Sequence, residues 1–482
     1  MSVVASPDGL DQNDGTAASP WPLERGLEAL QNDEDVLFLR GGTYVGQFVI
    51  RKLAGTALKP KVICSYPGEQ AVIDGTLEDF RDAPNDLWAP VVGTNSDEYI
   101  STRPYDHDND AAARGSFLDR VPHTRLITHQ FPDDLRSENE RCGHLPLDEA
   151  VDGPEPAEDA LFRRPWVYMG PGIVQDDRGF IHVRLSPTHN NVAGFPDYDG
   201  ETDPRKVPLA IWTSAQGTLR IVDCKAVHVC DIIVRHGDAS VVIDNCTDVR
   251  LDHVEVFAGN DGIRLDRTCV GTVISHCLVD GGLPPWHFRS DHKDGFQLKS
   301  DPDPKGHAPG ENTMKTLLRG SPHCQGTKIT FCELVNGHDN SLFGRDVEFS
   351  RNWVRNMNDD AVIIDTENSA DHRIFGNVIE QCQFAISSGG HSVAGAGTLA
   401  YRNLIDLRRP FAKSRPRPAG ATTGDSAPPD SLELDDGNVL ATGNVYKSNP
   451  PRRTACRLPE HDGGERPNHR FVVPLLPQLQ ER

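Results

Sequence analysis

The fold is decided by residues 221–280, which read IVDCKAVHVCDIIVRHGDASVVIDNCTDVRLDHVEVFAGNDGIRLDRTCVGTVISHCLVD. Short apolar runs rich in β-branched residues recur in this stretch, separated by Gly, Asn and Asp, and no helix-period pattern lies between them. Three cysteines mark the repeat: Cys246 follows Cys224 by 246 − 224 = 22 residues, and Cys269 follows 269 − 246 = 23 residues later. Such a repeat predicts a parallel β-solenoid in which each rung buries its apolar face against the next.

The repeat continues toward the C-terminus, although two rungs carry insertions. A small residue followed by an apolar-x-apolar triplet recurs with intervals of 22, 33, 46, 20 and 24, at Ser240, Gly262, Gly295, Ser341, Ala361 and Ala385. Segments at 281–291 and 300–320 account for the two long intervals. Residues 218–405 are therefore expected to form a β-helix in which Cys224, Cys246 and Cys269 stack as small core residues. Cys277 and Cys332 are expected to face inward as well.

The segments around the repeat predict a cap, an insertion and a tail. In PWPLERGLEALQ (20–31), Leu23, Leu27 and Leu30 are spaced for one face of a short helix that closes the N-terminal end. The DDRG sequence at 176–179 predicts an antiparallel hairpin within a β-rich insertion. The predicted units are the cap and first rungs (1–89), the inserted subdomain (90–205), the main rungs (206–409), and a Pro-rich loop with the C-terminal segment (410–482).

Composition limits the classes of partner. The 482 residues carry 49 Lys and Arg against 71 Asp and Glu, a net charge of −22, which argues against a general nucleic-acid or anionic-membrane surface. No apolar stretch is long enough for a membrane span, and MSVVASPDG lacks the features of a signal peptide. The expected location is cytoplasmic if the chain is complete, and secreted or periplasmic if a leader was trimmed.

Strand alternation predicts which side chains share the outer face of the rungs. The inward set is Val241, Ile263, Phe296, Leu342 and Val362. The outward residues that follow them are Arg264, Gln297 and Phe343, then Asp266, Lys299, Arg345 and Asp365; the turns before the strands hold Asp261, Asp294, Asp359 and Asp360. These aspartates either satisfy turn backbone groups or, as like charges stacked about 5 Å apart, hold a cation such as calcium.

Two parts of the sequence resemble right-handed parallel β-helix proteins of the pectate-lyase-like superfamily. Residues 3–76 resemble the cap and first rungs of these proteins, in particular WPLERGLEALQNDEDVLFLRGGTYVGQFVI (21–50) and YPGEQAVIDG (66–75). Residues 218–405 resemble the same proteins through the repeat. DGFQLK (294–299) and NDDAVIID (358–365) are similar to the aspartate rungs of family-nine pectate lyases, where such aspartates hold calcium. The resemblance implies calcium as the cofactor, with Asp294, Asp359, Asp360 and Asp365 as ligands; the stacked column adds Asp261.

The same resemblance bears on the catalytic residues. In family-nine pectate lyases the base is a lysine in a GFKLGG rung after the DDG rung, whereas the comparable rung here reads FAISSGGHS (384–392). Lys299, Arg345 or His391 is then the expected base, and Arg264 is expected to stabilise the substrate carboxylate beside calcium. A salt bridge with Asp266 is an equally good role for Lys299.

The expected function is that of a polysaccharide lyase, which would cleave an acidic, uronate-containing polysaccharide by calcium-assisted β-elimination. The order of Asp294, the aspartates 359–360 and GGH (389–391) also matches polygalacturonase-type glycoside hydrolases, so a hydrolase or a uronan epimerase is an alternative. A non-catalytic polysaccharide-binding or surface solenoid is the third. Trp286, Gln297 and Phe343 are candidate substrate-binding residues, although the two aromatic rings are equally suited to anchoring loops.

Overall fold

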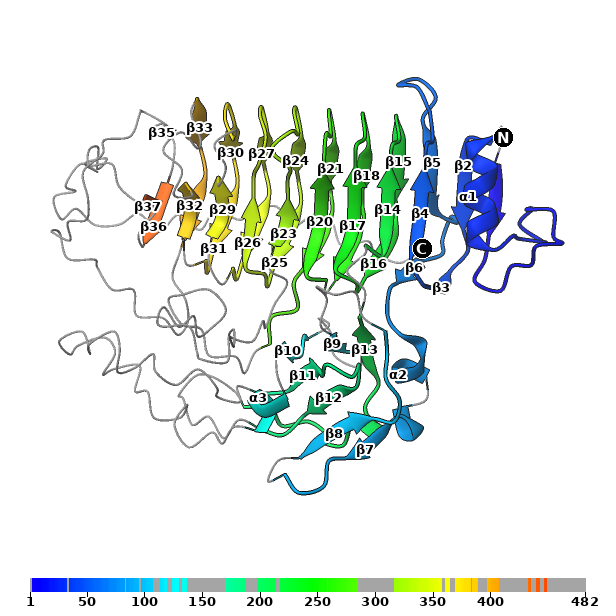
Figure 1. The fold of residues 1–482 in the computed structure, drawn as a ribbon. Coiled ribbons are helices and arrows are strands. Elements are labelled where there is room, and N and C mark those ends of the chain that lie inside the picture. Colours follow the sequence, from blue (N-terminus) through cyan, green and yellow to red (C-terminus); the bar gives the residue numbers. More distant parts are fainter. Residues whose placement is uncertain are drawn as a thin grey trace, which may run out of the picture.

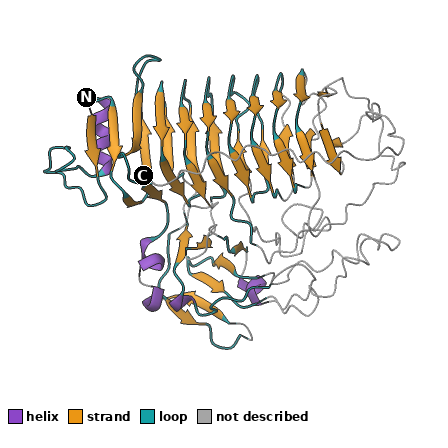
Figure 2. Ribbon diagram, turned by 180° about the vertical axis from the view of Figure 1, so that it is seen from behind, coloured by secondary structure: helices purple, strands orange, loops and turns teal. Residues whose placement is uncertain are grey.

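The computed structural model shows a right-handed parallel β-helix with a smaller subdomain beside it (Figure 1, Figure 2). It describes residues 2–32, 34–82, 84–94, 97–106, 113–118, 124–129, 132–136, 170–187, 197–213, 217–257, 259–284, 316–357, 360–364, 369–382, 384–388 and 397–406, and the strands within 432–448. Within these residues the β-helix consists of three long sheets of eleven, ten and nine strands. The fold predicted from the 22-residue repeat is confirmed.

Each sheet takes one strand from successive rungs. The eleven-stranded sheet contains β1 (Ser2–Ala5), β2 (Val36–Leu39), β5 (Lys61–Ser65), β15 (Val227–Cys230), β18 (Arg250–Asp252), β21 (Val273–Ser275), β24 (Lys328–Thr330), β27 (Glu348–Ser350), β30 (Arg373–Phe375), β33 (Thr398–Tyr401) and β35 (Leu432–Leu434). The ten-stranded sheet contains β3 (Gly42–Val45), β6 (Ala71–Asp74), β16 (Ile232–Arg235), β19 (Glu255–Phe257), β22 (Leu278–Asp280), β25 (Glu333–Val335), β28 (Trp353–Arg355), β31 (Val378–Glu380), β34 (Leu404–Asp406) and β36 (Val439–Thr442). The nine-stranded sheet contains β4 (Phe48–Arg51), β14 (Leu219–Val222), β17 (Ala239–Asp244), β20 (Asp261–Asp266), β23 (Thr316–Arg319), β26 (Asp339–Ser341), β29 (Asp360–Ile364), β32 (Phe384–Ser388) and β37 (Tyr446–Ser448).

Two corners of the rung differ in the length of chain they hold. Between residues 227 and 406, one or two residues join each strand of the eleven-stranded sheet to the next strand of the ten-stranded sheet. One residue at each of these turns has a positive φ, as at His253 (53°) and His276 (52°). We call this turn the sharp corner. The connection from the ten-stranded to the nine-stranded sheet is the wide corner, and it holds the long segments 75–218 and 281–315.

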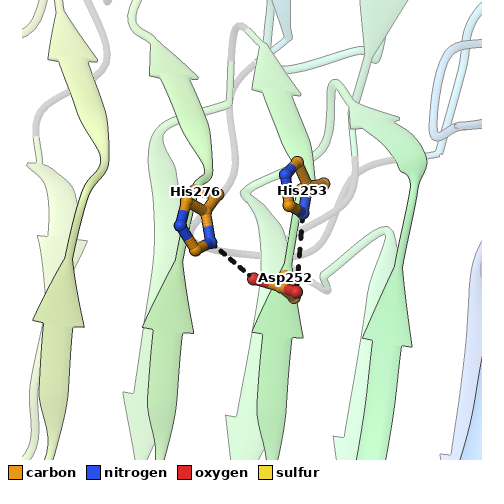
Figure 3. Close-up of side chains that lie close together, drawn as sticks. All are labelled: Asp252, His253 and His276. Carbon is orange, nitrogen blue, oxygen red and sulfur yellow. Dashed lines mark hydrogen bonds and ion pairs between the residues drawn. The ribbon is translucent and has the colours of Figure 1, made fainter. Parts of the chain in front are cut away.

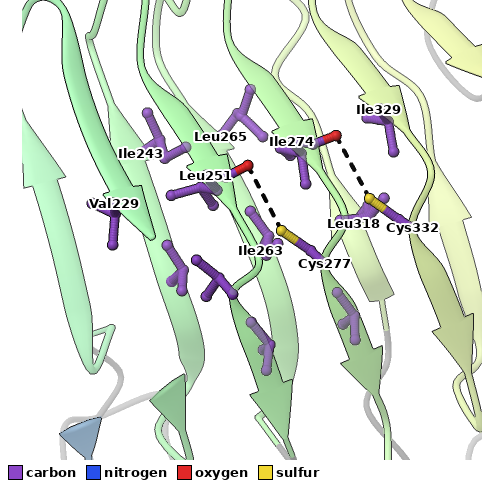
Figure 4. Packing of buried hydrophobic residues seen from close by; sticks show 14 of the residues in the cluster. Val229, Ile243, Leu251, Ile263, Leu265, Ile274, Cys277, Leu318, Ile329 and Cys332 are labelled. Atoms are coloured by element: carbon purple, nitrogen blue, oxygen red, sulfur yellow. Dashed lines mark hydrogen bonds between the residues drawn. The ribbon is translucent and has the colours of Figure 1, made fainter. Parts of the chain in front are cut away.

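The predicted cysteine ladder lies in the core of the β-helix. Cys224, Cys246 and Cys269 are 3%, 2% and 0% exposed, and the Cys224 backbone N–H donates to Cys246 Sγ at 3.3 Å. Cys277 and Cys332 also point inward, where each thiol faces a backbone carbonyl of the preceding rung (Figure 4). The cysteines therefore act as small core residues whose thiols still find hydrogen-bond acceptors.

The inward set predicted from strand alternation is confirmed where the structure describes it. Val241, Ile263, Leu342 and Val362 are all buried, whereas Phe296 lies outside the described residues. Their neighbours in the core are mostly leucine, isoleucine and valine from all three sheets, several of which appear in Figure 4. Because each rung contributes the same apolar positions, the core runs continuously along the solenoid axis.

A short helix, α1 (Leu23–Gln31), covers the N-terminal end of the solenoid, as the sequence predicts (Figure 1). Leu23, Leu27 and Leu30 are buried and belong to the main core. Gly26 permits the close approach, because a Cβ atom at this position would lie 2.7 Å from Leu37 Cδ1 on the first rung. The cap thus removes the apolar edge that an open solenoid end would expose.

The inserted subdomain is β-rich and has a core of its own. Its five-stranded sheet has the order β10-β11-β12-β8-β7, with β7 (Trp88–Pro90), β8 (Glu98–Ser101), β10 (Ile127–Thr128), β11 (Gly172–Gln175) and β12 (Ile181–Arg184). A second sheet pairs β9 (Arg114–Phe117) with β13 (Leu209–Trp212), and the helices are α2 (Glu78–Asp82), η1 (Pro84–Asp86), α3 (Pro132–Arg136) and η3 (Pro204–Lys206). The hairpin expected at DDRG is the antiparallel pair β11–β12. The core runs from Phe80 to Ile211, beyond the predicted limits of 90 and 205.

The register of the nine-stranded sheet corrects one sequence prediction. The repeat alignment assigns residues 294–299 to the rung after β20, which would place Lys299 beside Asp266 and Gln297 beside Arg264. In the structure β20 pairs with β17 on one side and with β23 on the other, so Arg319 is the register partner of Arg264. The alignment is wrong here because the insertion at 281–315 contains a segment that imitates the repeat.

The described part of the chain holds no helix that is both long and apolar enough to cross a membrane.

Candidate functional site

An outward row of the nine-stranded sheet brings two arginines together. The row contains the register partners Val242, Arg264, Arg319, Ser341 and Ile363 on successive strands. Arg264 and Arg319 are neighbours in it, and strands in one sheet lie about 4.8 Å apart. Two guanidinium groups are therefore presented side by side on one face. This arrangement is costly unless an anion lies between them.

Asp261 is the anion that both guanidinium groups contact. It is the first residue of β20, its side chain is 1% exposed, and its Oδ2 lies 3.4 Å from Nη1 of both Arg264 and Arg319. Its other oxygen, Oδ1, is buried and has no hydrogen-bond partner among the described residues. Burial raises the pKa of Asp261 above its usual range, with a further contribution from Asp238, although the two arginines oppose the shift. The carboxyl group therefore holds a proton more readily than an ordinary aspartate.

The inserted subdomain completes the cluster from the side of the wide corner. Asp238, in the turn before β17, accepts from Arg264 Nη1 at 3.0 Å and from Arg114 Nη1 of β9 at 3.4 Å. A second arginine of the subdomain, Arg125, is fully buried and donates to the Gly259 carbonyl at 3.0 Å. We call Arg114, Asp238, Asp261, Arg264 and Arg319 the arginine–aspartate cluster. Asp266 Oδ2 also accepts from Arg264 Nε at 3.2 Å, so the three arginines of the cluster meet three carboxylates, and Arg319 is the most exposed of these arginines.

A buried hydrogen-bond chain fixes the subdomain next to this cluster. His236 Nδ1 lies 2.7 Å from Asp74 Oδ1, and its Nε2 lies 3.2 Å from Ser116 Oγ of β9. The His236 ring also stacks on Trp212 of β13 at 5.3 Å between centroids. Asp74, Ser116 and His236 are all 0% exposed, so a substrate cannot reach them. The chain therefore positions β9 and its Arg114 rather than performing chemistry.

One predicted site residue, Arg345, lies away from the arginine–aspartate cluster, whereas Phe343 lies beside the residue that follows Arg319. Arg345 lies in the turn that leads from the nine-stranded to the eleven-stranded sheet, where its Nη2 is 2.6 Å from Asp371 Oδ2 and its side chain is 61% exposed. Asp261 begins β20 at the wide corner, which is the opposite end of the strands of this sheet. Phe343 is half-buried and packs beside Gly320, where an added Cβ would lie 3.2 Å from Phe343 Cβ. The structure therefore separates Arg345 from Arg264, which the alignment had placed together.

Two of the predicted calcium ligands, Asp261 and Asp360, are described and do not share one site. Each begins a strand of the nine-stranded sheet, but β20 and β29 are separated by β23 and β26, which amounts to about 14 Å at about 4.8 Å per strand. Oxygen ligands of one calcium ion each lie about 2.4 Å from it. Asp261 is in addition held by two guanidinium groups, whose charge opposes a divalent cation. Asp261 therefore does not fit the calcium site, and Asp360 remains its one described candidate.

The other predicted site residues lie outside the described residues; they are Trp286, Asp294, Gln297, Lys299, Asp359, Asp365 and His391. The sequence analysis missed Arg319 and Arg114. For Arg319 a signal exists, because TLLRG (316–320) repeats the pattern of apolar residues around an arginine seen in GIRL (262–265). For Arg114 no local signal exists, since its role depends on how the subdomain packs.

Comparisons with known proteins give a partial sequence match and weak structural likenesses. No family model matches the chain. A stretch of 96 residues is 35% identical to the pectate lyase PEL9 of Emericella nidulans and covers 18% of this chain but only 22% of that relative. Among solved structures, a glycoside hydrolase has a TM-score of 0.45 at 12% identity over 84% of this chain and 87% of its own. The pectate lyase Pel9A has a TM-score of 0.39 at 10% identity, over 93% and 79%. Since both TM-scores are below 0.5, nothing about activity follows from these two likenesses.

Proposed function

We propose that this chain is a carbohydrate-active enzyme that cleaves an acidic, uronate-containing polysaccharide by β-elimination at the arginine–aspartate cluster. The observation that carries the proposal is the register pairing of Arg264 with Arg319 on either side of Asp261. Paired guanidinium groups suit planar carboxylates, which they can bind with two hydrogen bonds each. The partial similarity to a pectate lyase supports the same class of substrate.

In the proposed reaction, Arg264 and Arg319 act while the proton α to the uronate carboxylate is removed. The base removes the proton α to the uronate carboxylate, the charge moves onto that carboxylate, and the glycosidic C–O bond at the β-carbon then breaks as a double bond forms. Arg264 and Arg319 would stabilise the charge that develops on the carboxylate. The leaving oxygen takes up a proton from water, because the Asp261 carboxyl is 1% exposed and serves to hold the two arginines.

The base is proposed from the remaining sequence candidates. Arg345 is a poor choice because it is paired with Asp371 in the turn at the far end of the strands from Asp261. Lys299 and His391 lie outside the described residues and stay predictions. Calcium stays a proposal too, with Asp294, Asp359, Asp360 and Asp365 as its predicted ligands; bound at Asp360, it would add positive charge to the same sheet, two strands from Arg319.

A glycoside hydrolase is the second candidate, from the order of Asp294, the aspartates 359–360 and GGH (389–391) in the sequence. Such enzymes require one carboxyl group that is protonated and can act on the glycosidic oxygen. The two activities differ in their products, because elimination leaves an unsaturated sugar and hydrolysis does not.

The test is a screen of uronate and neutral polysaccharides with the full chain, with added calcium or with a chelator. Ultraviolet absorbance reports unsaturated products, and a reducing-end assay reports all chain cleavage. Unsaturated product from a uronate polymer supports the lyase. Reducing ends without absorbance select the hydrolase, and binding without either product selects a non-catalytic solenoid.

A further inference from the structure

A cluster of two histidines and one aspartate lies at the sharp corner, away from the arginine–aspartate cluster. Asp252 ends β18, His253 follows it, and His276 follows β21 on the next rung (Figure 3). Asp252 and Ser275 are register partners, so the two histidines occupy equivalent positions on adjacent rungs. One donor atom from each of Asp252, His253 and His276 lies within 4.8 Å of the others.

We infer that Asp252, His253 and His276 form a binding site for a divalent transition-metal ion of the zinc class. Two imidazole nitrogens with one carboxylate is a donor set that zinc, nickel and copper prefer, whereas calcium takes oxygen ligands. Three protein ligands leave one tetrahedral position for water. The side chains are 25%, 59% and 40% exposed in that order, so both an ion and its water can enter.

The backbone places the three donors before any ion binds. His253 and His276 both have φ near 50°, and their N–H groups bond to the carbonyls of Ser275 and Thr330 on the following rungs. The two imidazole rings stack at 4.8 Å with an interplanar angle of 13°. The far face of His276 stacks on Phe331 at 5.4 Å, which holds its ring in place. Little conformational entropy is therefore lost on binding.

The distances require only a small closure. Nδ1 of His276 lies 2.9 Å and Nδ1 of His253 lies 3.5 Å from the carboxylate oxygens of Asp252. The same carboxylate accepts from Ser275 Oγ at 2.6 Å and pairs with Arg250 Nη2 at 3.2 Å, and an entering ion must displace this guanidinium, whose side chain is 43% exposed. Donors bound at about 2.0 Å in a tetrahedron are about 3.3 Å apart, which rotation of His253, the most exposed of the three side chains, can supply. Each Nδ1 must offer a lone pair to the ion, so its proton moves to Nε2 or to solvent.

The site would join two rungs of the solenoid. Asp252 and His253 belong to one rung and His276 to the next, and the chain between the two histidines runs through β19, β20 and β21. An ion bound to the folded arrangement and not to the unfolded chain stabilises the fold by mass action.

The test uses untagged full-length protein with zinc chloride, measured by isothermal titration and by thermal melting. The variant His253→Asn/His276→Asn removes the ligands while keeping a residue that tolerates a positive φ. Asp252→Asn is the second variant, and His323→Asn, an exposed histidine elsewhere, is the control. We expect the double variant to melt like the wild type without zinc, and to bind one equivalent fewer per chain than the wild type and the control.

Asp252→Asn should bind that equivalent at least tenfold more weakly. A chelator should reverse the rise in melting temperature that zinc causes in the wild type. Equal zinc stoichiometry in the wild type and the double variant would overturn the inference, and so would a wild type that binds no zinc at neutral pH.

Discussion

Arg264 and Arg319 occupy the same register position on neighbouring strands, although the segment 281–315 separates their rungs in the sequence. Asp261 Oδ2 lies at 3.4 Å from a guanidinium nitrogen of each. Such an arrangement uses one buried carboxylate to hold two cations in place while leaving Arg319 about half exposed. The exposed guanidinium is then available to an external anion.

Arg319→Ala is expected to raise the KM for a uronate polymer by about tenfold to a hundredfold, because charge-assisted hydrogen bonds contribute about 1.5 to 3 kcal/mol. Arg373→Ala is the matched control, since Arg373 is equally exposed but lies on the eleven-stranded sheet. The measurement is steady-state kinetics on the polymer found in the screen. Equal KM values in the two variants would contradict the role given to Arg319.

Asp261→Asn should weaken cleavage of the polymer, because it removes the anion that holds Arg264 and Arg319, and should make thermal stability less dependent on pH than in the wild type. Burial raises the pKa of Asp261 in the folded protein, so between the unfolded and folded pKa values the native state binds more protons than the unfolded one. Stability from this group is therefore lost as the pH rises through that window. Melting curves of both proteins at several pH values check this, and an unchanged pH dependence of the melting temperature in the variant would disprove it.

His372 should make the fold sensitive to acid. Its Nδ1 accepts the Val347 N–H at 3.2 Å, so the neutral ring carries its proton on Nε2, which lies 2.7 Å from Ser369 Oγ. Burial lowers the pKa of His372 to about 4. The unfolded chain takes up a proton near pH 6.5, so stability should fall as the pH drops from about 6.5 to about 4.

Denaturant unfolding of His372→Asn and wild type at both ends of this range tests the prediction. The variant should be less stable at pH 7 and should lose less stability on acidification. His323→Asn is an exposed control. An unchanged pH slope in His372→Asn would transfer the acid sensitivity to other buried histidines.

Calcium should raise the melting temperature through preferential binding to the folded state, and a chelator should reverse the rise. Asp360→Asn tests the one described member of the predicted ligand set, which is 2% exposed. Its calcium-induced shift should be smaller than that of Asp261→Asn. Melting that does not respond to calcium or chelator in the wild type would remove calcium from the proposal.

Lys299→Ala should abolish elimination while leaving the fold and the calcium response intact. The reason is chemical, because only a group that accepts the α-proton lets the double bond form. Wild-type activity in this variant would transfer the role to His391 or Arg345. Wild-type activity in all three single variants would end the lyase proposal.

Local patterns were sufficient for much of the fold. The cysteine spacing predicted the stacked ladder, and the leucine spacing predicted the cap, because both depend on one repeated contact. The segment DGFQLK was misassigned because it matches the rung pattern better than TLLRG does. Only the hydrogen-bond register of the sheet decides between two such segments. Part of the site is therefore local, as with Asp261 and Arg264, and part depends on long-range packing.

Arg114 shows the limit of sequence analysis most clearly. Its approach to Asp238 depends on the buried contact between Ser116 and His236, which joins two separately packed cores. Nothing in the residues around position 114 specifies that contact. A cluster assembled between a solenoid and an insertion becomes visible only in three dimensions.

The sharp corner and the wide corner differ in how readily they accept inserted residues during evolution. At the sharp corner, one extra residue would shift a strand by one position and turn its apolar side chains outward. At the wide corner, 75–218 and 281–315 are accommodated while the strands on either side keep their register. New loops can therefore accumulate beside Asp238 and Asp261 without disturbing the stack. Substrate preference can thus diverge between relatives, or be engineered by loop grafting, while the solenoid itself is conserved.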